Sequence, residues 1–169
     1  YVKGKDELVA AMIDRAVGDP PVLDVRGGWR PRLEAWTMLL AETWEHHPWL
    51  PLATMGDRAM GPNEIAWIDR AMATLADTPL LPTEQMAVVL LICGHIRNTH
   101  STATAGTQPW SDGRERALLG EQVDHYPALS RILDGDGDGL PDRGRAFGMT
   151  CILGGVEAIL GSRAASASS

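Results

Sequence analysis

The 169-residue chain has little lysine, few aromatic rings other than indole and no long apolar run. Lysine occurs only at positions 3 and 5 and the formal charge is −7, which argues against the clustered basic surface that phosphate contacts require. No apolar run reaches about 18 residues, and the first residues lack the basic-then-apolar order of a signal peptide. We therefore expect no membrane span, no export signal and no DNA-binding face on the main body of the chain.

Cysteine is scarce too, and the motifs that mark common metal and catalytic sites are missing. Cys93 and Cys151 fall in apolar helical patterns far apart in sequence, which suits small buried residues in a reducing compartment better than a disulfide. The chain contains no HExxH, paired CxxC, nucleophile elbow or phosphate-binding glycine loop. We expect a cytoplasmic protein with no cofactor, no bound metal and no catalytic residue.

One acidic loop resembles part of a calcium site. Asp134, Asp136 and Asp138 alternate as in the first half of an EF-hand loop, but the twelfth position is Arg145, where bidentate coordination needs Glu. The sequence therefore favours a flexible acidic turn between helices over a calcium site.

Tryptophan is in excess, with six residues against one Phe and two Tyr. Helical spacing dominates and no strand alternation extends beyond a few residues, so we predict an all-α fold. Short turns are expected after Pro48 and Pro127. The predicted helices span about residues 5–17, 29–47, 62–78, 82–106, 112–125 and 141–160.

Two features of these helices leave alternatives open. The tryptophans and methionines that recur at helical spacing either fill a solid core or line a cavity for an apolar ligand. Arg97, which directly follows an apolar run, either turns to solvent or points inward to hold a polar group of a ligand. For His95, in the same run, the pattern favours a hydrogen-bonded core histidine. The small residues Gly148 and Gly155 are expected to let another helix approach closely.

Four short motifs occur in this order along the chain: YVKGKDEL at the start, HHPWL from His46, MGPNE from Met60 and FGMTCILGGVEAIL from Phe147. Together they resemble the TetR family of transcriptional regulators, in particular the C-terminal domain of its tetracycline-repressor branch. The first motif is similar to the end of the recognition helix running into the next helix. The last is similar to the closing dimer helix of that family.

The resemblance implies a ligand-binding and dimerisation domain over residues 19–163. Residues 1–18 would be the remnant of a helix-turn-helix domain and its connecting helix, with the preceding helices absent, and residues 164–169 a disordered tail. The family's behaviour implies a homodimer formed through a four-helix bundle, and a small, largely apolar effector whose binding releases operator DNA. Operator DNA would be bound through the missing N-terminal helices.

Three sets of site residues follow from the resemblance and from the helix spacing. The DNA backbone would be contacted by Tyr1, Lys3 and Lys5. The effector would touch Trp36, Leu40, Trp44, Trp67, Met86, Leu90 and Arg97. The dimer interface would contain Leu91, Asn98, Thr102, Phe147, Cys151, Gly155 and Ile159.

Two other functions remain possible on the sequence alone. The chain could be a small helical enzyme that works in the same pocket with His95 as its acid or base. It could also be a dimerisation module with a solid core and no ligand. Ligand binding without turnover would distinguish a sensor from both.

Overall fold

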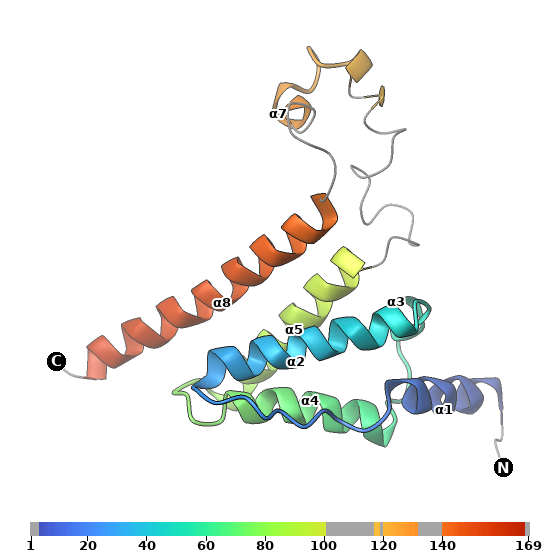
Figure 1. Cartoon of the computed structure of the whole chain (residues 1–169), viewed down its shortest axis with the longest axis vertical. Helices are drawn as coiled ribbons and strands as arrows, with labels where there is room; N and C mark the ends of the chain where they lie inside the picture. The colour runs from blue at the N-terminus through green and yellow to red at the C-terminus, as the bar shows by residue number, and fades with distance from the viewer. Residues whose placement is uncertain (1–3, 101–116, 119, 132–139, 168–169) are drawn as a thin grey trace.

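The computed structural model describes residues 4–100, 117–118, 120–131 and 140–167, and the secondary-structure elements in these ranges are all helices (Figure 1). The all-α prediction is therefore confirmed for the described part of the chain. Its elements are α1 (Lys5–Val17), α2 (Trp29–His46), α3 (Leu50–Ala53), α4 (Pro62–Thr74), α5 (Pro82–His100), α7 (Pro127–Ser130) and α8 (Leu140–Ala167).

Glycine and proline set many of the helix ends, as the sequence predicts. α1 ends at Gly18, whose φ of 67° belongs to the left-handed region that glycine adopts at little cost. α4 and α5 both begin with proline, whose missing N–H is not needed in a first turn. In each of these two helices a glutamate reaches back to the preceding backbone: Glu64 accepts from the Gly61 N–H at 3.0 Å, and Glu84 accepts from the Leu81 N–H at 2.8 Å.

Two predicted boundaries differ from the structure. α4 ends at Thr74, four residues earlier than predicted, and the chain turns there. α8 continues beyond Leu160 to Ala167 and so includes four residues of the expected disordered tail. Two causes extend it: alanine has the best helix propensity, and Arg163 donates to both carboxylate oxygens of Glu84, at 2.7 and 2.6 Å. The predicted acidic loop lies outside the described residues, as do residues 112–116 and 119 of the helix predicted over residues 112–125. The described part of that helix is helical at residues 117, 118, 120 and 121 and forms a turn at residues 122–125.

The core lies where α2, α4 and α5 meet. In Figure 1, α2 and α4 run alongside each other, α1 extends beyond one end of α4, and α8 diverges from both. α8 packs on α5, and the α8 residues Leu153 and Val156 are buried. Side chains with essentially no exposed surface include Ile13, Leu33, Trp36, Ala71, Val89 and Ile92.

The apolar helix α5 is covered on only part of its circumference. Leu90 and Leu91 remain more than half exposed, although a helix that is apolar on all sides is usually enclosed. In the described part of the chain, no helix combines the length and the hydropathy needed to cross a membrane.

Candidate functional site

A cavity of about 360 Å³ lies between α2, α4 and α5, bordered by the connection from α3 to α4. This volume is within the range of about 300–1,000 Å³ that is common for small-molecule sites. Met86, predicted to touch the effector, is half-buried on α5 but is not part of the cavity wall. The structure brings the other six predicted effector residues together in this wall: Trp36, Leu40, Trp44, Trp67, Leu90 and Arg97.

The tryptophans in this wall belong to the core and border the cavity at once. The rings of Trp36 and Trp67 meet edge to face, with centroids 6.2 Å apart, and neither side chain is more than 6% exposed. Trp36 Nε1 donates to the Trp67 carbonyl at 3.0 Å, and Trp67 Nε1 donates to the Gly18 carbonyl at 3.1 Å. Because both indole N–H groups are used inside the protein, these residues present mainly carbon to the cavity.

Arg97 turns inward, which is the second of the two alternatives for this residue. Its Nε donates to the Pro51 carbonyl at 3.1 Å, and its Nη2 donates to the Thr54 hydroxyl at 3.3 Å. The guanidinium carbon lies 5.5 Å from the centre of the Trp44 ring, a cation–π arrangement. Arg97 is therefore held in the cavity wall by two neutral acceptors and one ring face.

A second arginine in the wall forms an ion pair with Glu64. Arg58 donates to Glu64 with both terminal nitrogens, the Nη1 bond measuring 2.9 Å. Burial alone would raise the pKa of Glu64, but the hydrogen bonds from Arg58 and the Gly61 backbone outweigh it and hold that pKa below its ordinary value. The pair is charged at neutral pH. Sequence reasoning missed it, since only the position of Glu64 in the first turn of a helix was recognisable.

The same wall is bonded to α1. The Asp14 carboxylate accepts from the backbone N–H of Asn63 at 2.7 Å and of Glu64 at 3.3 Å, and so caps α4 from another helix. The Asn63 side chain donates back to the Asp14 carbonyl at 3.1 Å. A side chain at Gly61 would overlap Asp14, so the close approach of α1 requires glycine there. These contacts span about fifty residues of sequence, and no local pattern indicates them.

The two cysteines have different environments, and both are free thiols. Cys93 borders the cavity, where burial raises the pKa of its thiol to about 11, so that it is neutral at pH 7. Cys151 is exposed, contrary to the expectation that both would be buried. The reason is that it lies on a face of α8 that the described residues of this chain leave uncovered.

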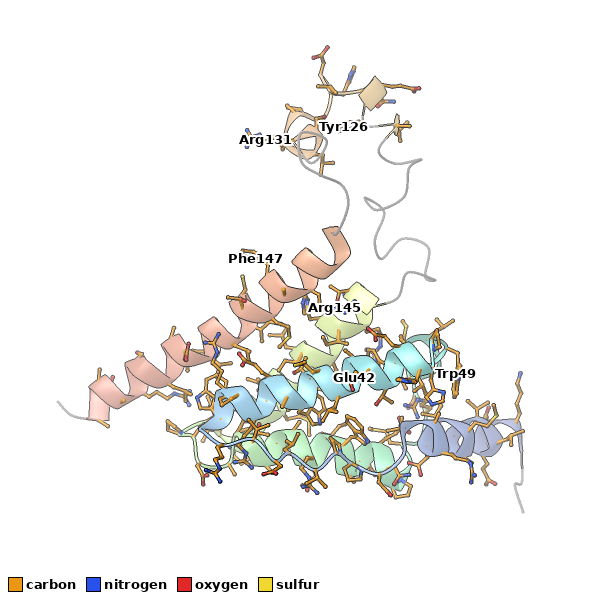
Figure 2. The ribbon with its side chains drawn as sticks, viewed as in Figure 1. Glu42, Trp49, Tyr126, Arg131, Arg145 and Phe147 are labelled. Atoms are coloured by element: carbon orange, nitrogen blue, oxygen red, sulfur yellow. The ribbon has the colours of Figure 1, made fainter. Side chains whose placement is uncertain are left out.

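That uncovered face carries the predicted dimer residues. Phe147 is 72% exposed, and Figure 2 shows it on the side of α8 that faces away from α2. The described members of the predicted set, all exposed, are Leu91 and Asn98 on α5 and Phe147, Cys151, Gly155 and Ile159 on α8. Thr102, Tyr1 and Lys3 lie outside the described residues, and Lys5 is exposed at the start of α1.

His95 lies between α5 and α8 and is not part of the cavity wall. Its Nε2 is 2.9 Å from the Arg145 carbonyl, which confirms a hydrogen-bonded histidine at a helix contact. A side chain at Gly148 would overlap the His95 ring, so the prediction of close approach is confirmed at that glycine. The enzyme alternative placed His95 in the effector pocket. The structure corrects that position, because the residue points to α8 and not towards α2 and α4.

A second hollow, of about 640 Å³, opens between α2 and α8 on another side of α2. Its wall contains Met38, Met149 and Leu153 together with three glutamates of α2 and Arg145. Met38 is 64% exposed, so this hollow is a surface groove. Among the described residues, no group of three or more His, Cys, Asp or Glu side chains is placed to hold a metal ion.

Comparison with known proteins identifies one family. The family model described as the tetracyclin repressor-like C-terminal domain matches residues 21–160, which is most of the chain. No curated protein gives a significant match.

Proposed function

The chain belongs to the tetracyclin repressor-like C-terminal domain family, and from this premise we propose that it is the effector-binding and dimerisation domain of a transcriptional repressor. The effector is a small, largely apolar molecule that occupies the cavity between α2, α4 and α5. Its binding releases operator DNA. The observation that carries this proposal is that the cavity wall is bonded directly to α1, the helix nearest the N-terminus.

The polar contacts of α4 offer a route from the cavity to α1. Trp67 contacts the cavity with its ring and the end of α1 with its Nε1, and Asp14 of α1 caps the first turn of α4. A ligand that displaces α4 therefore also displaces α1. A dimeric helix-turn-helix regulator needs its two reading helices about 34 Å apart, so a shift of the connecting helix lowers the affinity for DNA. A coupling of about 1–3 kcal/mol would give roughly 5- to 150-fold release.

A DNA-reading segment is proposed on the N-terminal side of α1, where Tyr1, Lys3 and Lys5 would contact phosphates and position the regulator without reading bases. Such a regulator works in the cytoplasm. The overall charge of −7 argues against DNA binding by the main body of the chain itself.

The exposed stripe on α5 and α8 supports a homodimer. A two-fold axis would bring the stripe of one subunit onto the same stripe of its partner and form a four-helix bundle. Exposed Leu91, Phe147 and Ile159 are large apolar residues whose burial would stabilise the pair. Sedimentation velocity at tens of micromolar tests this point, and a persistent monomer would contradict it.

A thermal-shift screen of metabolites tests the sensing function. We expect saturable stabilisation by at least one small apolar compound, with no product formed. The variant Leu90→Trp, which places a bulky indole in the cavity wall, should lose the response, whereas Leu81→Trp, at an exposed position outside the wall, should keep it. Turnover of the stabilising compound would favour the enzyme alternative. A response that survives Leu90→Trp unchanged would place the ligand elsewhere.

A further inference from the structure

The charged residues of the cavity wall suggest which class of effector it takes. The wall contains two arginines and one glutamate, so its charge is 2 − 1 = +1, although the whole chain carries −7. Glu64 is already neutralised by Arg58. The positive charge that remains belongs to Arg97, which α5 contributes to the wall.

Arg97 has no anionic partner among the residues that the structure describes. The ion pairs found there join other residues, and the two hydrogen bonds of Arg97 go to a carbonyl and a hydroxyl. A guanidinium has five N–H donors, and these bonds use two of its three nitrogens. A half-buried cation that already faces an aromatic ring gains most from a carboxylate, which accepts two parallel hydrogen bonds.

Arg58 adds a second observation. Its Nε is buried and has no hydrogen-bond partner within the described ranges, while its terminal nitrogens are occupied by Glu64. A buried donor without an acceptor is uncommon in folded proteins and is often explained by a missing ligand or water. Most other polar groups of the wall are satisfied internally: Trp36 and Trp67 donate to carbonyls, and Thr54 donates to the Leu50 carbonyl at 2.8 Å. The arginines are thus the donors that remain for a ligand.

We propose that the effector is a planar aromatic monocarboxylate, with its ring system among Trp36, Trp44 and Trp67 and its carboxylate on Arg97. This inference rests on the proposed effector-binding function and adds the sign of the ligand's charge to it. The tryptophans supply flat apolar surfaces, the cavity volume suits a two-ring compound, and the carboxylate balances the excess charge of the wall.

Three compounds of nearly the same shape test the charge preference: 1-naphthaleneacetate, its neutral carboxamide and the cationic 2-(1-naphthyl)ethylamine. Dissociation constants are measured by isothermal titration calorimetry at pH 7. We expect the carboxylate to bind at least about tenfold more tightly than the amide, the ratio that one charge-assisted hydrogen bond produces, and the amine to bind most weakly.

Variants then assign the preference to Arg97. Arg97→Met should reduce the carboxylate-to-amide ratio to within about twofold while the amide still binds, and Arg97→Lys should keep part of it because the charge remains. Arg131→Met removes the same charge at an exposed position on the far side of the molecule and should change nothing (Figure 2). Circular dichroism checks that each variant is folded. If Arg97→Met does not fold, the relative affinities of the three compounds for the unmodified chain still show whether the cavity prefers an anion.

The outcomes separate this inference from the proposed function. Equal binding of acid and amide, or tighter binding of the amine, would overturn the anionic effector but leave a binding cavity in place. A carboxylate preference that survives Arg97→Met would overturn the role of Arg97. If none of the three compounds binds, the aromatic effector class is wrong, and the metabolite screen then shows whether the cavity binds any ligand.

Discussion

α4 and α8 both pack against α5, but they are held in different ways. α4 is fixed by directional polar contacts, namely the Asp14 cap from α1, the Trp67 bond to Gly18 and the glutamate at its first turn. α8 lies against α5 through buried Leu153 and Val156 and the close approach at Gly148, with an ion pair near its end. Its outer face is apolar and exposed. Directional polar contacts select one arrangement of two helices, whereas an exposed apolar face is typical of a surface that binds another molecule.

The largest expected effect comes from charging the outer face of α8. We expect Phe147→Asp to raise the dimer dissociation constant by about 100-fold or more, because each subunit would bring an unpaired carboxylate into an apolar interface. Thr150→Asp adds the same charge on a neighbouring face of the helix and serves as the control. Sedimentation equilibrium measures both. Similar dissociation constants for the two variants would move the interface away from this stripe.

Changing the inner face of α8 should destabilise the chain itself. Gly148→Ala places a methyl group on the His95 ring, and overpacking of this kind costs about 1–3 kcal/mol of unfolding free energy. Gly154→Ala meets no atom of the described residues within 4 Å, so it should gain about 0.5–1 kcal/mol from helix propensity. Urea unfolding compares the two. A stabilising Gly148→Ala would mean that α8 is not held against α5 at this point.

Removing the Asp14 cap from α4 should have a moderate effect on the free energy of unfolding. Asp14→Ala deletes the cap on α4, for which we expect a loss of about 0.5–2 kcal/mol in unfolding free energy. Asp14→Asn keeps one acceptor oxygen and should recover much of it, while the exposed Asp6→Ala should lie within about 0.5 kcal/mol of the unmodified chain. Chemical denaturation at pH 7 measures all three. Equal losses for Asp14→Ala and Asp6→Ala would show that the cap does not hold α4.

The smallest effect concerns the ion pair between Glu84 of α5 and Arg163 of α8. The hydrogen bonds from Arg163, together with the Leu81 N–H, lower the pKa of Glu84 to about 2. Glu84 binds a proton more readily in the unfolded state than in the folded state. The ion pair therefore contributes fully to the free energy of unfolding above about pH 4.5, and this contribution is lost as the pH falls towards 2. We therefore expect Arg163→Met to lower the melting temperature slightly at pH 6 and not at pH 2.

NMR titration of Glu84 provides the direct measurement. Its pKa should return towards about 4.3 in Arg163→Met, and Arg15→Met, which removes an exposed arginine of α1, should leave it near 2. An unchanged pKa in Arg163→Met would mean that the two side chains do not pair in solution. The contribution is small because both partners are partly exposed to water.

The helices and the broad location of the cavity could be predicted from sequence because both depend on local spacing. The repeats of Trp36, Leu40 and Trp44 at three- and four-residue intervals put these side chains on one face of α2, whatever that face meets. The apolar run of α5 indicates a helix surrounded by others, but packing within the described chain leaves Leu90 and Leu91 more than half exposed. The end of α8 was harder to predict, since the Arg163 pairing that accompanies its last turns joins residues 79 positions apart.

The sequence by itself determined an all-α chain with an aromatic stripe, because helical periodicity, proline and glycine act over a few residues. Only the tertiary structure decided that Arg97 turns inward, that Arg58 pairs with Glu64 in the cavity wall, and that α1 caps α4 through Asp14. Each of these depends on which helix faces which across the core. That pairing is set by the packing of whole surfaces, which no local spacing of residues encodes.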